Sequence, residues 1–141
     1  EEVIFNAQRY KTGMALIKID IDHLYMYNNT YGRPEGDTVI KAISNLLRSY
    51  ARDTDIICRY SGDEFIVILV EVDKNTAVNT AERIRQAIQS KVNQRDVKIT
   101  ASIGVVSYPE DATDKTELMN KVYTSVDEAK HSGRNRVCYP K

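Results

Sequence analysis

The chain has 141 residues, of which 42% are hydrophobic, a size and composition that predict one globular domain with one continuous core. Its 20 basic residues balance 20 acidic residues, so the overall charge favours neither nucleic acid nor an anionic membrane as a partner. No run approaches the roughly 18 apolar residues of a membrane span, and the first residues, EEVIFNAQRYK, lack the apolar region of a signal peptide. Cys58 and Cys138 are far apart and lack C-x-x-C spacing, which is typical of reduced cysteines. We therefore expect a single cytoplasmic domain over 1–141.

Apolar runs and helical patterns alternate along the chain. The run at 14–19 (MALIKI) predicts a buried strand that ends at Asp20, and a short helix over Leu24–Tyr31 is expected to stop at Gly32. Later helices are indicated by apolar residues on one face, and Gly133 occupies a helix-stop position. The remaining predictions, in chain order, are a helix at 36–50, hairpin strands at 56–60 and 65–69, a helix at 75–91, a strand at 97–106, a helix at 115–132 and a strand at 136–139.

The predicted order is β-α-α-β-β-α-β-α-β. Two helices on one face of a mostly antiparallel sheet, with a hairpin in its centre, form a ferredoxin-like or palm-type arrangement. The fold class is therefore α+β, with a central antiparallel sheet flanked by helices.

The segment Ser61-Gly62-Asp63-Glu64 joins the two hairpin strands. A tight turn accounts for the glycine, which takes a positive φ without penalty, but not for two adjacent carboxylates. The predicted sheet places this tip beside Asp20 and Asp22 at the end of the first strand. Converging carboxylates are costly unless a cation lies between them, and hard oxygen ligands indicate Mg²⁺ or Mn²⁺.

Four segments together resemble the GGDEF domain of diguanylate cyclases. They are IDIDHLYMYNNTYGRPEGD, SGDEF, ITASIGV and DEAKHSGRNRV, in the order and spacing of that family. The chain lacks the D-x-L-T-G-L-x-N-R segment that usually opens the domain, and we expect the upstream regulatory region to be missing.

The resemblance implies that two GTP molecules, one on each subunit of a transient two-fold homodimer, are joined into cyclic di-GMP with release of pyrophosphate. It assigns Asp20, the Ile21 carbonyl and Asp63 as ligands of Mg²⁺ or Mn²⁺, with Glu64 beside them. Asp63, with Glu64, is also the catalytic candidate, because it can accept the proton of the attacking hydroxyl. Gly62 lets the backbone approach the nucleotide closely.

The resemblance also implies substrate-binding residues outside the signature. Asn28 and Asp37 match the pair that recognises guanine, and an aspartate suits the N1–H and N2–H₂ donors that adenine lacks. Lys130 and Arg134, on either side of the end of the last long helix, match the pair that binds the β- and γ-phosphates.

An inhibitory site is implied by Arg52-Asp53-Thr54-Asp55, an R-x-x-D motif separated by five residues from Ser61. In the family this site binds product dimers. Arg52 and Asp55 would carry it, with Arg83 on the next helix as a third ligand.

The chain departs from the family pattern at several positions. Ser61 replaces the first glycine of the signature, and Tyr123 stands where the last helix usually has an aspartate. Tyr25 replaces a lysine thought to steady charge on the reacting phosphates, and losing one such contact costs on the order of 10²–10³ in rate. Two alternatives to an enzyme therefore stay open: a regulatory module that binds GTP or cyclic di-GMP, and a ferredoxin-like interaction domain without nucleotide.

Overall fold

The computed structural model of the chain describes residues 2–92 and 95–141. The predicted order of strands and helices is confirmed, with one helix added before it. The elements are α1 (Glu2–Tyr10), β1 (Met14–Asp22), α2 (Leu24–Tyr31), α3 (Arg33–Tyr50), β2 (Ile56–Ser61), β3 (Glu64–Val70), α4 (Lys74–Ala87), the π-helical turn η1 (Ile88–Val92), β4 (Thr100–Tyr108), α5 (Lys115–His131) and β5 (Arg136–Cys138).

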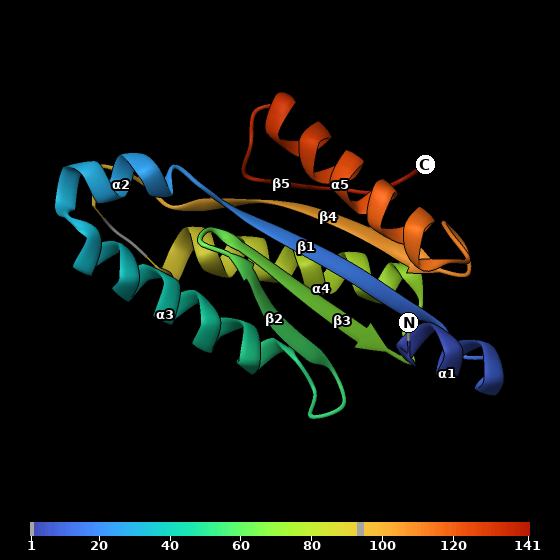
Figure 1. The fold of residues 1–141 in the computed structure, drawn as a ribbon. Coiled ribbons are helices and arrows are strands. Elements are labelled where there is room, and N and C mark those ends of the chain that lie inside the picture. Colours follow the sequence, from blue (N-terminus) through green and yellow to red (C-terminus); the bar gives the residue numbers. More distant parts are fainter. Residues whose placement is uncertain (1, 93–94) are drawn as a thin grey trace.

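The strands form one mixed sheet in the order β2-β3-β1-β4-β5, with β1 in the centre (Figure 1). β1 pairs antiparallel with β3 and β4, and the short β5 runs parallel to β4. The register places Asp20 of β1 opposite Glu64 of β3 and Ser102 of β4. The predicted α+β fold, with the signature on a hairpin beside the central strand, is confirmed.

The central strand β1 has one apolar face and one face that changes from apolar to polar. All nine of its residues are buried, and successive side chains point to opposite faces of a strand. The odd-numbered residues from 15 to 21 join the larger hydrophobic cluster. On the other face Met14 and Leu16 belong to a smaller cluster. They are followed by three buried polar residues, Lys18, Asp20 and Asp22, so the polar end of the strand lies on this second face.

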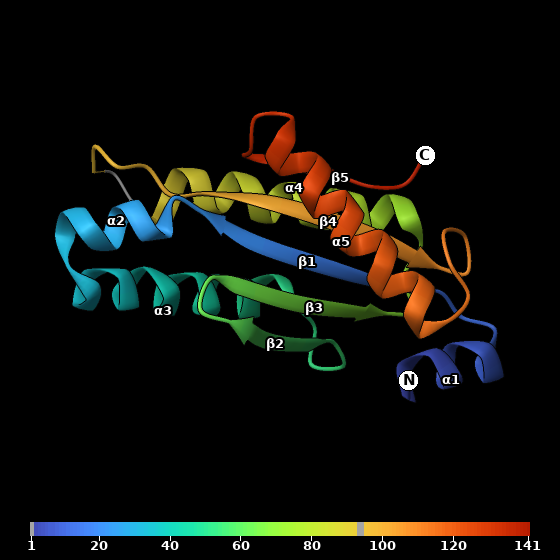
Figure 2. The same cartoon turned by 45° about the horizontal axis from the view of Figure 1, so that its top comes forward.

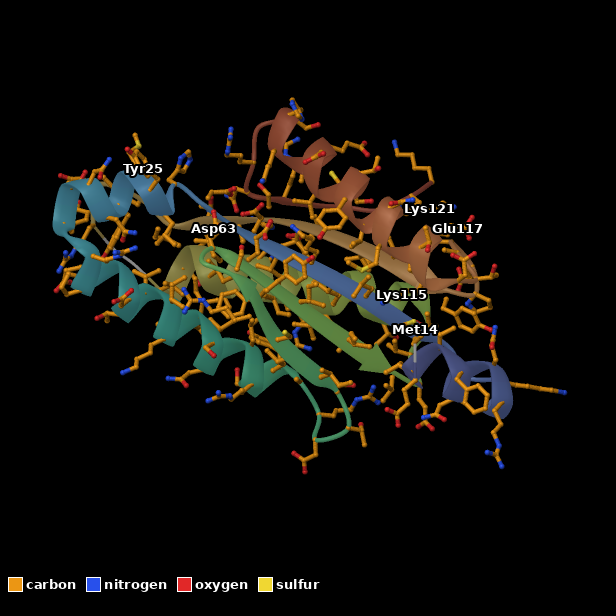
Figure 3. All side chains as sticks on the ribbon, in the orientation of Figure 1. Met14, Tyr25, Asp63, Lys115, Glu117 and Lys121 are labelled. Carbon is orange, nitrogen blue, oxygen red and sulfur yellow. The ribbon has the colours of Figure 1, made fainter. Side chains whose placement is uncertain are left out.

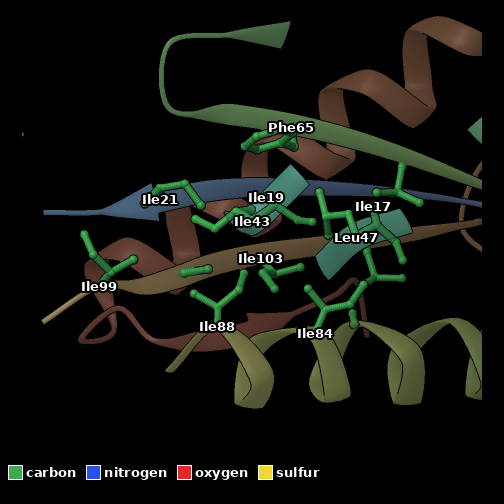
Figure 4. Packing of buried hydrophobic residues seen from close by; sticks show 14 of the residues in the cluster. Ile17, Ile19, Ile21, Ile43, Leu47, Phe65, Ile84, Ile88, Ile99 and Ile103 are labelled. Carbon is green, nitrogen blue, oxygen red and sulfur yellow. The ribbon is translucent and has the colours of Figure 1, made fainter. Parts of the chain in front are cut away.

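Helices cover both faces of the sheet. α3 and α4 share the apolar face, as predicted for two helices on one side, and α5 and α1 lie on the other (Figure 2). Figure 4 shows Ile43 of α3 and Ile84 of α4 among the buried residues of the larger cluster, where each such side chain stabilises the fold by roughly 1.5–3 kcal/mol. α5 packs very closely on β4, because a Cβ on Gly104 would stand 2.8 Å from the Val122 carbonyl oxygen.

Several boundaries differ from the predicted ones. β1 continues to Asp22, so Asp20 lies within the strand and not at its exit. α3 begins at Arg33, three residues earlier than predicted, because Pro34 suits the first turn of a helix. The strand predicted at 97–106 is shifted to Thr100–Tyr108, and the helix predicted at 75–91 ends in η1. Within the described ranges, no helix is long and apolar enough to cross a membrane.

Candidate active site

The tip of the β2–β3 hairpin is tied to the central strand. The Ile21 N–H donates a 2.8 Å hydrogen bond to the Asp63 carbonyl. The Arg59 guanidinium donates to the carbonyls of Ser61 and Gly62, at 3.3 and 2.9 Å. The expectation of a positive φ at Gly62 is wrong. A Cβ there would meet no heavy atom within 4 Å, so the missing side chain leaves open space at the tip.

Three of the four carboxylates expected at this edge are gathered there. Asp20 and Glu64 are register partners across the β1–β3 pair, and Asp63 lies exposed at the hairpin tip (Figure 3). Burial raises the pKa of Asp20; the nearby charge of Asp63 adds to the rise, while the Lys130 ammonium opposes it. The edge thus concentrates negative charge that a cation would stabilise.

Two lysines neutralise part of this charge. Lys130 of α5 forms an ion pair with Asp20, and Lys18 of β1 places its Nζ 2.8 Å from Glu64 Oε1. The Ser61 hydroxyl donates to the other oxygen of Glu64 at 2.7 Å. The hydrogen bond from Lys18, and then that from Ser61, hold the pKa of Glu64 below its usual value.

The fourth carboxylate, Asp22, is engaged in hydrogen bonds that hold the fold together. It accepts hydrogen bonds from the hydroxyls of Thr100 and Ser102, at 2.7 and 2.8 Å, and from the Asn135 N–H at 3.1 Å. The Nε of Arg134 lies 4.0 Å from Asp22, and about half of the Arg134 side chain is exposed. Asp22 therefore joins β1 to β4 and to the loop after α5, and it is not available as an ion ligand.

The remaining oxygens fit a divalent cation in their chemistry. Asp20, Asp63 and the Ile21 carbonyl supply the hard oxygen ligands that Mg²⁺ and Mn²⁺ prefer. In the part of the chain that the structure describes, no three acidic, histidine or cysteine side chains stand ready as an ion site. Lys130, whose side chain is 35% exposed, must first move away from Asp20.

A cavity of about 260 Å³ opens beside this edge, between α2, α3 and the hairpin tip. Both predicted guanine-binding residues, Asn28 and Asp37, line it together with Gly62 and Asp63. The Oδ1 atom of Asn28 is buried against Gly36 and has no hydrogen-bond partner among the described residues, so a ligand N–H would satisfy it once the side chain turns toward the cavity. Gly36 makes room for this amide, because a Cβ there would stand 1.6 Å from Asn28 Oδ1.

The R-x-x-D residues lie elsewhere, in the turn before β2. Asp55, with a side chain 1% exposed, accepts hydrogen bonds from the Arg52 N–H at 2.8 Å, the Val70 N–H at 3.1 Å and the Arg52 guanidinium. A cavity of about 320 Å³ is lined by Arg52, Asp55 and Tyr50. Arg83 of α4 stacks over the Tyr50 ring, 5.2 Å from its centroid. The three predicted residues thus border one region.

The family profile described as "Diguanylate cyclase, GGDEF domain" matches residues 1–136 of the chain. The chain belongs to the GGDEF family. Diguanylate cyclase A from Treponema denticola is 35% identical to this GGDEF domain over 134 residues, which are 93% of the chain and 36% of that protein. The chain therefore spans about a third of the length of this relative.

Solved structures share the fold of this GGDEF domain. The active GGEEF domain of a diguanylate cyclase from Vibrio cholerae superposes with a TM-score of 0.91 at 28% identity, covering 99% of this chain and 90% of that one. The GGDEF domain of DgcB from Caulobacter crescentus, in complex with c-di-GMP, has a TM-score of 0.87 at 27% identity, covering 98% and 84%. The predicted family is confirmed.

The least expected residue of this GGDEF domain is Lys18. The sequence carries one signal for it, a single charge inside the otherwise apolar run at 14–19 that predicts a buried strand. Tyr25, in place of the family lysine, lines the cavity between α2, α3 and the hairpin tip and is 81% exposed. Tyr123, in place of the family aspartate, holds its ring 4.8 Å from Lys18 Nζ. Neither tyrosine brings a positive charge to the site.

Proposed function

We propose that this GGDEF domain is a diguanylate cyclase that condenses two GTP molecules into cyclic di-GMP and two pyrophosphates. The observation that carries the proposal is the meeting of Asp20, Asp63 and Lys130 at one edge, beside a cavity that contains Asn28 and Asp37. Acidic ligands, a phosphate-binding cation and a guanine-binding pair are the three parts that this reaction requires.

Guanine selection falls to the cavity between α2 and α3. The Asp37 carboxylate accepts hydrogen bonds from the N1–H and N2–H₂ groups of guanine, and the unpaired Oδ1 of Asn28 accepts one more. Adenine offers no such pair of donors, so GTP is favoured over ATP. Lys130 and Arg134 bind the β- and γ-phosphates, which gives Lys130 a partner when it leaves Asp20.

The chemistry is an attack of one 3′-hydroxyl on the α-phosphate of the other GTP. A 3′-oxygen–phosphorus bond forms, the α–β phosphoanhydride bond breaks, and pyrophosphate leaves. Mg²⁺ or Mn²⁺, held by Asp20, the Ile21 carbonyl and Asp63, would supply positive charge to the triphosphate. Asp63, exposed at the hairpin tip, accepts the proton of the attacking hydroxyl.

One chain supplies one guanine pocket to this reaction, so two chains must meet with their hairpin tips facing each other. The initial rate is therefore expected to rise more steeply than linearly with protein concentration while the dimer is a minor species. A strictly linear dependence at all concentrations would speak against a transient pair.

Product inhibition is proposed at the R-x-x-D turn, through Arg52, Asp55 and Arg83. The guanidinium groups of Arg52 and Arg83 offer cationic donors to guanine and phosphate oxygens, while Asp55 fixes Arg52 in place. Arg52→Ala is expected to abolish inhibition by added cyclic di-GMP and to leave the uninhibited rate within about twofold. Lys41→Ala, a substitution at an exposed residue of α3, serves as the control.

A second candidate function, a non-enzymatic module that binds GTP or cyclic di-GMP, is favoured by Tyr25. This residue lacks the positive charge that the family lysine would place near the reacting phosphates, although Arg33 and Arg59 line the same cavity. Binding would then persist without turnover.

One assay separates the two functions. The purified chain is incubated with GTP and Mg²⁺ at several protein concentrations, and pyrophosphate and cyclic di-GMP are quantified in parallel. A yield of two pyrophosphates for each cyclic di-GMP, abolished by chelation of the metal, supports the cyclase. Saturable binding of GTP or cyclic di-GMP without either product identifies the binding module, and binding of neither nucleotide would refute both functions.

A further inference from the structure

Lys18 is a buried cation in the middle of the sheet. The residue is 2% exposed, on the central strand, between register partners Ile66 of β3 and Gly104 of β4. Its ammonium lies 4.8 Å from the Tyr123 ring on α5. A hydrogen bond with Tyr60 raises the pKa of Tyr123 to about 12, so this neighbour stays neutral. A lysine in such surroundings requires a charged partner.

Glu64 is that partner, and its two oxygens are both engaged. Lys18 Nζ donates to Oε1 at 2.8 Å, and the Ser61 hydroxyl donates to Oε2 at 2.7 Å. The lowered pKa of Glu64 agrees with these contacts. The glutamate of the signature is thus held by two donors of its own chain.

We propose that Lys18 is an internal counter-ion that keeps Glu64 out of the coordination sphere of the divalent cation and thereby weakens cation binding in this chain. The inference rests on the proposed function, which places the cation between Asp20 and Asp63. It leaves Asp20, the Ile21 carbonyl and Asp63 as the ligands, and it assigns Glu64 to the ion pair with Lys18 in place of a role at the cation.

A comparison with Lys130 explains why the ion pair between Lys18 and Glu64 is expected to persist when the cation binds. The Lys130 side chain is 35% exposed, whereas Lys18 is 2% exposed. When Lys130 leaves Asp20, water and phosphate solvate its ammonium. If Glu64 turned toward a metal ion, the Lys18 ammonium would remain buried and unpaired, which is strongly destabilising. Glu64 therefore stays with Lys18 when the cation arrives.

The test measures Mn²⁺ binding directly, by electron paramagnetic resonance of the unbound ion, without nucleotide. In Lys18→Met the Glu64 carboxylate loses its counter-ion, so the Mn²⁺ dissociation constant is expected to fall about tenfold. In Lys18→Met/Glu64→Gln two uncharged side chains replace an ion pair whose net charge is zero. The Mn²⁺ dissociation constant is therefore expected to return to within about threefold of the original. Lys115→Met, at the other end of the sheet from Asp63 (Figure 3), controls for the loss of one positive charge and should change nothing.

The outcomes are decisive in both directions. Unchanged or weaker Mn²⁺ binding in Lys18→Met overturns the proposal, and so does a gain that persists in the double variant. Circular dichroism checks folding, and Lys18→Gln carries the same expectation if the methionine variant does not fold. Asp63→Asn is titrated in parallel: if it binds Mn²⁺ as the original chain does, the cation site itself is misplaced and the proposed function fails, whatever Lys18 does.

Discussion

Two regions pair a buried carboxylate with a basic side chain: the sheet edge where Asp20, Asp63 and Glu64 lie, called here the signature edge, and the Arg52–Asp55 turn. The two basic partners come from different distances along the chain. Asp20 is paired with Lys130, which comes from a helix near the opposite end of the chain. Asp55 is bonded to Arg52, three residues before it, and to the main chain of Val70. The first pairing depends on the tertiary fold, and the second is largely a local turn.

This difference decides what each carboxylate can do. Asp20 is paired with Lys130, whose side chain is partly exposed and free to move. A bound cation would replace Lys130 as the partner of Asp20, and a phosphate would replace Asp20 as the partner of Lys130. Asp55 already receives hydrogen bonds from two main-chain N–H groups, and a ligand could replace these only by opening the turn. Of the two carboxylates, Asp20 is suited to binding and Asp55 to holding a neighbouring arginine in place.

The largest expected effect is at the signature edge. Asp63→Asn keeps the size of the side chain but removes the charge that holds the cation and accepts the proton, so cyclic di-GMP formation should fall by at least about 100-fold. Pyrophosphate release measures it. Asp53→Asn, an exposed aspartate in the turn, is the matched control and should leave the rate unchanged. A residual rate above a tenth of the original would remove Asp63 from its proposed role.

The next largest effect is a loss of stability on substitution in the Arg52–Asp55 turn. Asp55→Ala leaves the main-chain N–H groups of Arg52 and Val70 without their acceptor, so the free energy of unfolding should fall by about 1–3 kcal/mol. Arg52→Ala, at a side chain 54% exposed, should cost about 1 kcal/mol or less. Urea denaturation compares the two. Equal losses would mean that the arginine, not the carboxylate, organises the turn.

A smaller gain is expected from restoring a cation at the cavity rim. Tyr25→Lys places an ammonium near the reacting phosphates and should raise turnover about tenfold. Because Tyr25 is 81% exposed, stability should not change. Tyr25→Phe, which has a similar ring and no charge, is the control. Turnover that is unchanged or lower in the lysine variant would contradict the interpretation of this position.

The smallest effect lies beside the turn, at the start of α4. Asp73 accepts a hydrogen bond from the Thr76 N–H at 2.7 Å, which lowers the pKa of Asp73 below its ordinary value of 3.8. A depressed pKa stabilises the fold above the unfolded-state value, and the contribution disappears as pH falls through the folded-state value. Asp73→Ala should therefore lower Tm slightly at pH 7 and not at about pH 2. A difference that persists in acid would exclude the carboxylate as its cause.

The sequence predicts the fold and the neighbourhood of the site better than the pairing of individual charges. Strand and helix patterns place Asp20 beside the hairpin, because that follows from topology alone. The sequence does not reveal that Asp22 is bonded to Ser102, or that Lys18 reaches Glu64. Those pairings depend on which residues face each other across strands, and a one-residue change of register moves every side chain to the opposite face.

The helix α1 was also missed, for a physical reason. Its nine residues are too few to form a stable helix alone, and the helix is supported by Ala7 packing against the smaller cluster beneath α5. Likewise, nothing in the R-x-x-D motif itself indicates that Asp55 is buried, since the acceptor role toward Val70 arises only when β3 returns alongside the turn.

The hydrogen bond between the Ile21 N–H and the Asp63 carbonyl has a mechanical consequence. It fastens the hairpin tip to the central, fully buried strand of the sheet, so opening the tip would also strain contacts of the hydrophobic core. Such a tip cannot be reshaped without disturbing the core. If two chains pair as proposed, control through the frequency and orientation of their meeting requires no change in the form of either hairpin tip.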